Sequence, residues 1–238
     1  MTERDLRYSR AAMRLFRLGF RPFQRLRLHT VLYLPAGFRV PDDRPVLFVA
    51  NHVSWWDGFL LLDLHHAVAP DRPLFTPMLA HELRRHPILR HLGALPLEQT
   101  TSGVRDLLRV LERQRARDPR FALTFFPQGR IRPSWARPLG VQRGIELLVQ
   151  RLAPCTVVPV ALHVEPLNRL RPTAFVHVGP PIHAGSRLHR DDIDARLRLQ
   201  LDQLLAHLAE HGESAAAHEP GLGTPARPFA APGTGTTP

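Results

Sequence analysis

The sequence predicts a single α/β domain, with a mixed central sheet flanked by helices and preceded by a basic amphipathic helical segment. Short apolar runs typical of buried strands alternate with longer stretches in which leucines recur every three or four residues. Hydrophobic residues make up 44% of the 238 residues, which is enough for the core of such a domain. We expect residues 1–40 to form the basic segment, 41–211 the domain, and 212–238 a disordered tail with little to bury.

The N-terminal segment is amphipathic over residues 5–34. Its arginines recur at intervals of three and four among leucines and phenylalanines, which is a helical period. Gly19 and Pro22 interrupt the pattern, so two short helices are expected rather than one. A helix of this kind suits an anionic membrane surface, and it equally suits packing on the domain with its arginines solvated.

The elements of the domain follow from hydrophobic periodicity and from the prolines and glycines between them. Strands are expected at residues 46–50, 74–76, 121–126, 156–162 and 175–178, with a short, partly extended segment at 93–97. Helices are expected at 55–68, 80–92, 103–117, 144–152 and 191–211. Pro87 interrupts the second of these helices. Pro159 cannot donate to a strand ladder, so its strand is expected to be interrupted or to lie near an edge.

Composition limits the partners and the compartment. The formal net charge of +11 draws the surface to anions such as phospholipid headgroups, nucleic acid or acidic substrates. Aromatic residues are only 7%, too few for a base-stacking surface, so no nucleic-acid partner is expected. The single cysteine, Cys155, favours a reducing compartment. We see neither a signal peptide nor an apolar run of about 18 residues, and expect a cytoplasmic protein, in solution or on a membrane surface.

Two strand ends carry polar residues suited to chemistry. The segment Asn51-His52-Val53-Ser54-Trp55-Trp56-Asp57 follows the first strand, and a histidine held by a nearby carboxylate can act as a general base. The alternative is a surface histidine at a helix start, with Asp57 in the first turn, where acidic residues are favoured. The second segment is Phe126-Pro127-Gln128-Gly129-Arg130, with further arginines close behind it.

Four segments, in order along the chain, resemble the glycerophospholipid acyltransferase family, which includes bacterial 1-acylglycerol-3-phosphate acyltransferases. Residues 51–57 fit the pattern N-H-x-S-x-x-D, and residues 92–99 are similar to G-x-I-x-x-x-R. Residues 126–130 are similar to F-P-E-G-T-R-S, and residues 157–161 to an apolar V-P-V segment. The resemblance spans roughly Pro45 to Ile182.

The resemblance implies an O-acyltransferase that moves a fatty acyl group from a thioester, acyl-CoA or acyl carrier protein, to a hydroxyl of a lysolipid or glycerol-phosphate-type acceptor. His52 would be the general base and Asp57 its orienting carboxylate, with backbone N–H groups near His52 or Gly129 as candidate donors to the oxyanion. No metal or other cofactor is implied, and the enzyme would lie on the cytoplasmic face of the membrane as a peripheral protein. The implied substrate-binding residues are Asn51, Ser54, Gln99, Pro127, Gln128, Gly129, Arg130, Arg132 and Arg143.

Three departures from the family pattern stand out. Gln99 stands where an arginine is expected, Gln128 where a glutamate is expected, and Arg130-Ile131 where the family has a threonine-arginine pair. Either nearby arginines bind an acceptor phosphate instead, or the acceptor is a non-phosphorylated lipid or glycolipid. Two other readings stay open: hydrolysis of the thioester by water, and a basic membrane- or nucleic-acid-binding protein without catalysis.

Overall fold

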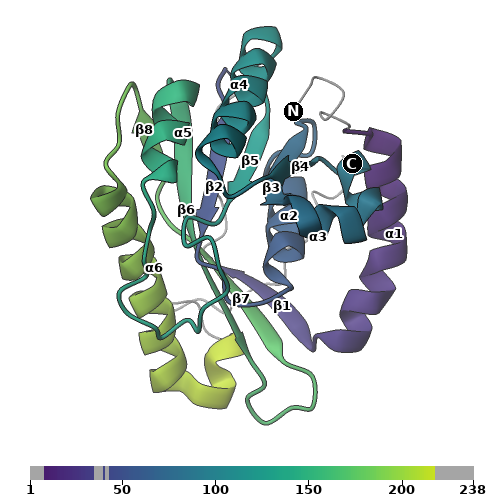
Figure 1. Ribbon diagram of the computed structural model, residues 1–238. Helices are drawn as coiled ribbons and strands as arrows, with labels where there is room; N and C mark the ends of the chain where they lie inside the picture. The colour runs from purple at the N-terminus through teal and green to yellow at the C-terminus, as the bar shows by residue number, and fades with distance from the viewer. Residues whose placement is uncertain (1–7, 35–39, 41–42, 218–238) are drawn as a thin grey trace, which may run out of the picture.

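The computed structural model, which describes residues 8–34, 40 and 43–217, contains one sheet of eight strands flanked by helices (Figure 1). The strand order is β1-β7-β6-β2-β5-β3-β4, and β8 pairs with β6. The strands are β1 (Thr30–Leu34), β2 (Val46–Ala50), β3 (Leu74–Leu79), β4 (Ala94–Leu97), β5 (Ala122–Phe125), β6 (Cys155–Glu165), β7 (Thr173–Val178) and β8 (Ile182–Ala184). This is the mixed α/β architecture that the sequence predicts.

The sheet is parallel through the centre and antiparallel toward one side. Strands β6, β2, β5, β3 and β4 run in the same direction, whereas β7 and β8 run antiparallel to β6 and β1 runs parallel to β7. In the register of β2 and β5, Val49 lies opposite Phe125. The loops that follow these two strands therefore leave the sheet side by side, at the carboxyl edge where ligands bind in α/β proteins.

Helices cover both faces of the sheet. The helices are α1 (Arg10–Arg27), α2 (Asp57–Val68), α3 (Ala80–Arg85), η2 (Pro87–His91), α4 (Thr101–Arg117), α5 (Gly144–Leu152), α6 (Arg190–His211) and η3 (Gly212–Ala217). Successive side chains of β2 point to opposite faces. Phe48 packs in the cluster that includes α1 and α2, whereas Leu47 and Val49 pack in the cluster that includes α4, α5 and α6. β2 is buried over all five residues, which explains its continuous apolar sequence.

The N-terminal segment forms one helix, not the two that the sequence predicts. Pro22 lies inside α1, on a solvent-exposed face where the carbonyl that it leaves unbonded can reach water. Met13 and Gln24 are buried on either side of it, and Phe20 stacks on Phe59 of α2 with ring centroids 4.2 Å apart. Packing on α2 therefore keeps the helix continuous through the proline.

The predicted boundaries of the domain also change. Strand β1, which the sequence does not predict, pairs with β7, so the first 40 residues contribute a strand to the sheet as well as a helix. At the other end, Gly212–Ala217 form η3, with Ala215 buried, where the predicted tail begins. The rest of that tail, residues 218–238, lies outside the described residues.

Pro159 lies in the middle of the sheet, contrary to the predicted edge or interruption. Strand β6 is continuous over 11 residues and has β2 on one side and β7 and β8 on the other. The carbonyl of Pro159 accepts from Gly179 in the β7–β8 connection, so its ring nitrogen faces that connection too. The pairing with β8 ends at Val157 and that with β7 begins at Val160, so the missing donor falls in a gap between two ladders.

Candidate active site

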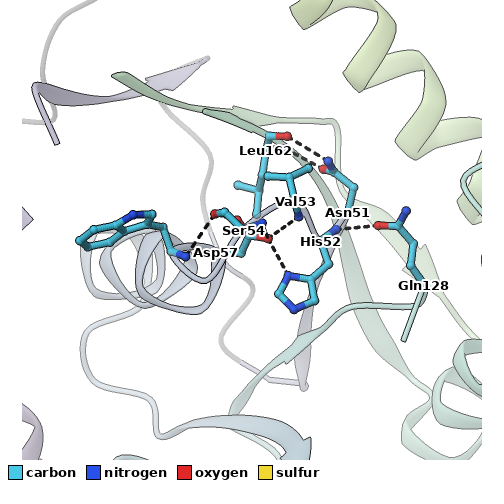
Figure 2. Close-up of polar contacts among 8 residues, drawn as sticks. Asn51, His52, Val53, Ser54, Asp57, Gln128 and Leu162 are labelled. Atoms are coloured by element: carbon cyan, nitrogen blue, oxygen red, sulfur yellow. Dashed lines mark hydrogen bonds and ion pairs between the residues drawn. The ribbon is translucent and has the colours of Figure 1, made fainter. Parts of the chain in front are cut away.

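His52 and Asp57 meet between the end of β2 and the start of α2. Their side chains are 2.6 Å apart, from Nδ1 of His52 to a carboxylate oxygen of Asp57 (Figure 2). The Asp57 side chain is fully buried, and the His52 side chain is 25% exposed. Because the carboxylate accepts a proton at Nδ1, the lone pair of the ring is on Nε2, which is bonded to no described residue. The pair therefore has the arrangement that a general base requires.

The hydrogen-bond donors to the buried Asp57 carboxylate all come from residues within five positions of it in the sequence. One carboxylate oxygen accepts from the backbone N–H groups of Val53 and Ser54, at 2.6 and 2.9 Å, as well as from His52. The other accepts from the Ser54 hydroxyl at 2.6 Å. These donors compensate the removal of the carboxylate from water and fix its orientation toward the imidazole.

The loop after β5 holds the backbone of His52 from the other side. The carboxamide oxygen of Gln128 accepts from the His52 N–H at 2.6 Å (Figure 2). Its nitrogen donates to the Leu139 carbonyl at 3.0 Å. The Arg132 N–H donates to the His52 carbonyl at 2.8 Å, and the ring of Phe126 stacks on the imidazole with centroids 4.4 Å apart. Two loops distant in sequence thus meet at one histidine.

Several residues with an implied substrate-binding role instead bond within the protein. Asn51, 2% exposed, bonds both backbone groups of Leu162 on β6, at 2.7 and 2.9 Å. Ser54 bonds Asp57, and Gln128 is 4% exposed with both ends of its amide engaged. Pro127 is buried, and its carbonyl accepts from the Gln142 N–H. These four residues therefore support the site from within the fold.

The expected oxyanion donors near His52 and Gly129 are also engaged. The N–H of His52 donates to Gln128, and those of Val53 and Ser54 donate to Asp57. Gly129 adopts φ +66° in a turn in which its N–H donates to the Phe126 carbonyl. These four N–H groups are therefore engaged within the protein, and the identity of the oxyanion donor stays a prediction.

The arginines behind the second motif divide into bonded and free groups. The Arg132 guanidinium donates to the carbonyls of Pro138 and Leu139, and Arg137 bonds Ser134 and Asp202. Arg130 and Arg143 are exposed, and neither pairs with a carboxylate among the described residues. These two are the side chains of the set that can meet an anionic substrate.

Gln99 lies at the same edge of the sheet but farther along it. It is exposed and follows β4, which is separated from β2 by β3 and β5. No hydrogen bond joins Gln99 to His52 or to Gln128 within the part of the chain that is described. The structure therefore brings together the first, third and fourth motifs and leaves the second at the end of the sheet.

One supporting contact carried no signal in the sequence. Ser134 and His163, both buried, lie 2.7 Å apart from hydroxyl oxygen to Nδ1 and attach the arginine-rich loop to the end of β6. Burial lowers the pKa of His163, although Glu165 opposes this effect. The two residues are separated by 29 positions, so no local pattern indicates the pairing.

Two further features of the described residues concern metal ions and membranes. In residues 8–34, 40 and 43–217, no group of three or more His, Cys, Asp or Glu side chains could hold a metal ion. None of the helices in that part of the chain is long and apolar enough to cross a bilayer.

Comparison with known proteins places the chain in a family. The family model described as Acyltransferase matches residues 28–163, more than half of the chain. The crystal structure of the 1-acyl-sn-glycerophosphate acyltransferase PlsC from Thermotoga maritima has a similar fold: the TM-score is 0.57 at 19% identity, over 82% of this chain and 80% of that one. No curated protein matches the sequence. The chain therefore belongs to the acyltransferase family and is an enzyme that transfers acyl groups.

Proposed function

We propose that the enzyme moves a fatty acyl group from acyl-CoA or acyl carrier protein to a hydroxyl of a lysolipid or glycerol-phosphate-type acceptor. The observation that carries the proposal is the His52–Asp57 pair, in which a buried carboxylate holds Nδ1 at 2.6 Å and Nε2 is left free on a partly exposed ring. An alcohol is a weak nucleophile until a base takes its proton during attack, and this pair supplies such a base.

The reaction then proceeds by proton transfer through His52. Nε2 takes the proton of the acceptor hydroxyl while the oxygen attacks the thioester carbonyl. Asp57 stabilises the imidazolium that forms, without itself becoming protonated. When the tetrahedral intermediate collapses, the C–S bond breaks, the acyl group stays on the acceptor oxygen, and the proton of the imidazolium passes to the thiolate. The products are an ester and a free thiol.

The free arginines support an acceptor that carries a phosphate. Arg130 and Arg143 are exposed, unpaired with described carboxylates, and lie in the loop that also contacts His52. The similar Thermotoga protein is described as acting on 1-acyl-sn-glycerophosphate, an acceptor of this class. A non-phosphorylated lipid or glycolipid is the second candidate, and the uncharged Gln99 at the position of the family's arginine favours it.

The outer face of α1 supports attachment to the cytoplasmic face of the membrane. Leu15, Leu18 and Leu26 on this face are 67–70% exposed, and exposed arginines flank them. Phe23 on the same helix stacks against Trp56 of the first motif, with ring centroids 5.7 Å apart. A helix with an apolar face and flanking arginines binds an anionic lipid surface, and this one would hold the motif next to its lipid substrate.

The catalytic proposal is tested by thiol release from an acyl thioester, measured with and without added 1-acylglycerol phosphate. We expect release that depends on the acceptor and is abolished by His52→Ala, whereas His86→Ala, at an exposed histidine, should leave it unchanged. Full turnover in His52→Ala would refute the assignment of the base. Release that is independent of the acceptor would identify a hydrolase instead.

The membrane proposal is tested by co-sedimentation with phosphatidylglycerol vesicles. Leu15→Glu combined with Leu18→Glu should weaken binding, because both changes place charge on the exposed apolar face of α1. Leu199→Glu is the matched control, since Leu199 is an exposed leucine on α6. Equal binding by all three proteins would exclude α1 as the contact, and binding to DNA in preference to vesicles would favour a basic binding protein.

A further inference from the structure

Gln128 occupies a position from which it can act on His52 but not on a substrate. Its side chain is 4% exposed, and both ends of the carboxamide are bonded inside the protein. The direction of the amide is fixed because the His52 N–H can only donate and the Leu139 carbonyl can only accept. The oxygen therefore faces His52 and the nitrogen faces Leu139.

The backbone of His52 depends on this loop for its position. β2 ends at Ala50, so the sheet ladder no longer holds the chain at His52. The loop supplies both missing partners, since Gln128 accepts from the His52 N–H at 2.6 Å and the Arg132 N–H donates to the His52 carbonyl at 2.8 Å. A shift of this backbone would displace the imidazole that Asp57 orients.

We propose that Gln128 is a positioning residue for acyl transfer, which holds His52 in place through a side chain that donates and accepts at the same time. The inference rests on the proposed function of His52. The family resemblance implied that Gln128 binds the substrate; the proposal assigns it a positioning role instead. The loss of a negative charge at this position then carries no information about the acceptor.

A neutral amide is required because the side chain must donate to the Leu139 carbonyl as well as accept from His52. A carboxylate in the same place could accept from the His52 N–H, but its second oxygen would face the Leu139 carbonyl with no proton between them. It would also place a charge in an interior position, which is unfavourable unless a partner compensates it. A protonated carboxyl, in contrast, has one donor and one acceptor in nearly the same shape as the amide. In this chain, the family's own glutamate should therefore function poorly except when it is protonated.

The test compares Gln128→Glu and Gln128→Met with the unchanged enzyme in the thiol-release assay from pH 5.5 to 8.5. At pH 8, Gln128→Glu should lower kcat about 10- to 100-fold and change the KM of the acceptor less than about twofold, because the base is misplaced while the substrate contacts stay. The activity ratio of Gln128→Glu to the unchanged enzyme should rise as the pH falls, since burial raises the pKa of a carboxyl and the group regains its proton.

The second variant and a control separate this role from loss of folding. Gln128→Met keeps the volume but neither hydrogen bond, so kcat should fall at every pH without the recovery on the acid side. Gln150→Glu makes the same chemical change on an exposed side chain of α5 and should behave as the unchanged enzyme. Thermal unfolding identifies any variant that does not fold. If Gln128→Glu does not fold, the kcat and KM of Gln128→Met decide the test.

Two results would overturn the proposal. One is a Gln128→Glu enzyme that is as active as the unchanged enzyme across the pH range, as would occur if Arg132 compensated the new charge. The other is a rise in the acceptor KM with kcat preserved in both variants, which would identify Gln128 as an acceptor-binding residue. An unchanged enzyme that releases no thiol, or releases it without His52, would instead refute the proposed function.

Discussion

Two loops meet at His52, and they differ in whether their contacts join residues that are close or distant in the sequence. In the loop after β2, Asp57 bonds groups three, four and five positions away, on Ser54, Val53 and His52. In the loop after β5, Gln128 reaches His52 across 76 positions, although its contact with Leu139 spans only 11. The first loop forms its geometry from its own residues, whereas the second positions His52 only after the sheet has assembled.

This difference explains why the two loops show different relations to the family pattern. In the first loop the side chains of His52, Ser54 and Asp57 are fixed by one another, and all three match the pattern. Asn51 matches it too, although its partner, Leu162, is distant in sequence. In the second loop residue 128 has two backbone partners, the His52 N–H and the Leu139 carbonyl. The amide of glutamine suits both, so this departure from the family pattern preserves the site.

The largest expected effect concerns the local loop. Asp57→Asn should lower kcat about 10²- to 10⁴-fold, because a neutral amide neither fixes the tautomer of His52 nor stabilises its protonated form. The thiol-release assay measures this effect, and Asp191→Asn on the exposed start of α6 is the matched control. An Asp57→Asn enzyme within about twofold of the unchanged one would show that the local loop does not orient the base.

The second prediction concerns the stability of the protein in acid. A loss of stability at low pH would also lower the activity, so it must be measured separately from the pH dependence of kcat. Burial lowers the pKa of His65, on α2, to about 3, with a smaller contribution from His66. The unfolded chain therefore binds the proton first, and stability is full above about pH 6.5 and is lost as the pH falls. By pH 4 the loss should be about 3 kcal/mol.

His65→Leu should remove this acid dependence. Nε2 of His65 is buried without a hydrogen-bond partner, and the backbone hydrogen bond that the ring makes with Arg72 is lost with it. That loss lowers the stability at both pH values and leaves the difference between them to the titration of His65. Urea unfolding at pH 7 and pH 4 measures the difference. Equal slopes of stability against pH in the two proteins would contradict the prediction.

The third prediction tests the long-range attachment of the first loop. Asn51 joins it to Leu162 of β6 across 111 positions, through two buried hydrogen bonds. Asn51→Ala leaves both backbone groups of Leu162 without that partner and should lower the free energy of unfolding by about 1–3 kcal/mol. Urea unfolding checks the value, and kcat should fall less than in Asp57→Asn. A larger loss of kcat would show that the local loop also needs the sheet for its geometry.

The smallest expected effect concerns the exposed arginines of the second loop. Arg130→Gln and Arg143→Gln should each raise the KM of a phosphorylated acceptor by about tenfold or less, because an exposed charge contributes little. Arg117→Gln, at an exposed arginine on α4, is the control. An unchanged KM in both variants would favour a non-phosphorylated acceptor.

Prediction from sequence succeeded where the structure depends on local patterns. The existence and order of most strands and helices followed from periodicity, and the His52–Asp57 pairing followed from the resemblance of residues 51–57 to a family motif. It failed for α1, β1 and Pro159, whose conformations depend on contacts with distant residues. The helix around Pro22 is held by Phe20, which packs on Phe59 of α2; β1 is held by β7, and Pro159 lies between two ladders.

By itself, the sequence determined the fold class, the acyltransferase motifs and the residues proposed as base and orienting carboxylate. These features arise from residues close together along the chain, whose spacing sets their geometry. Only the tertiary structure decided that Asn51, Ser54 and Gln128 face inward, and that Arg130 and Arg143 are free while Arg132 and Arg137 are bonded. The direction of a side chain in a loop depends on the partners that folding brings beside it, and those partners lie up to 111 positions away.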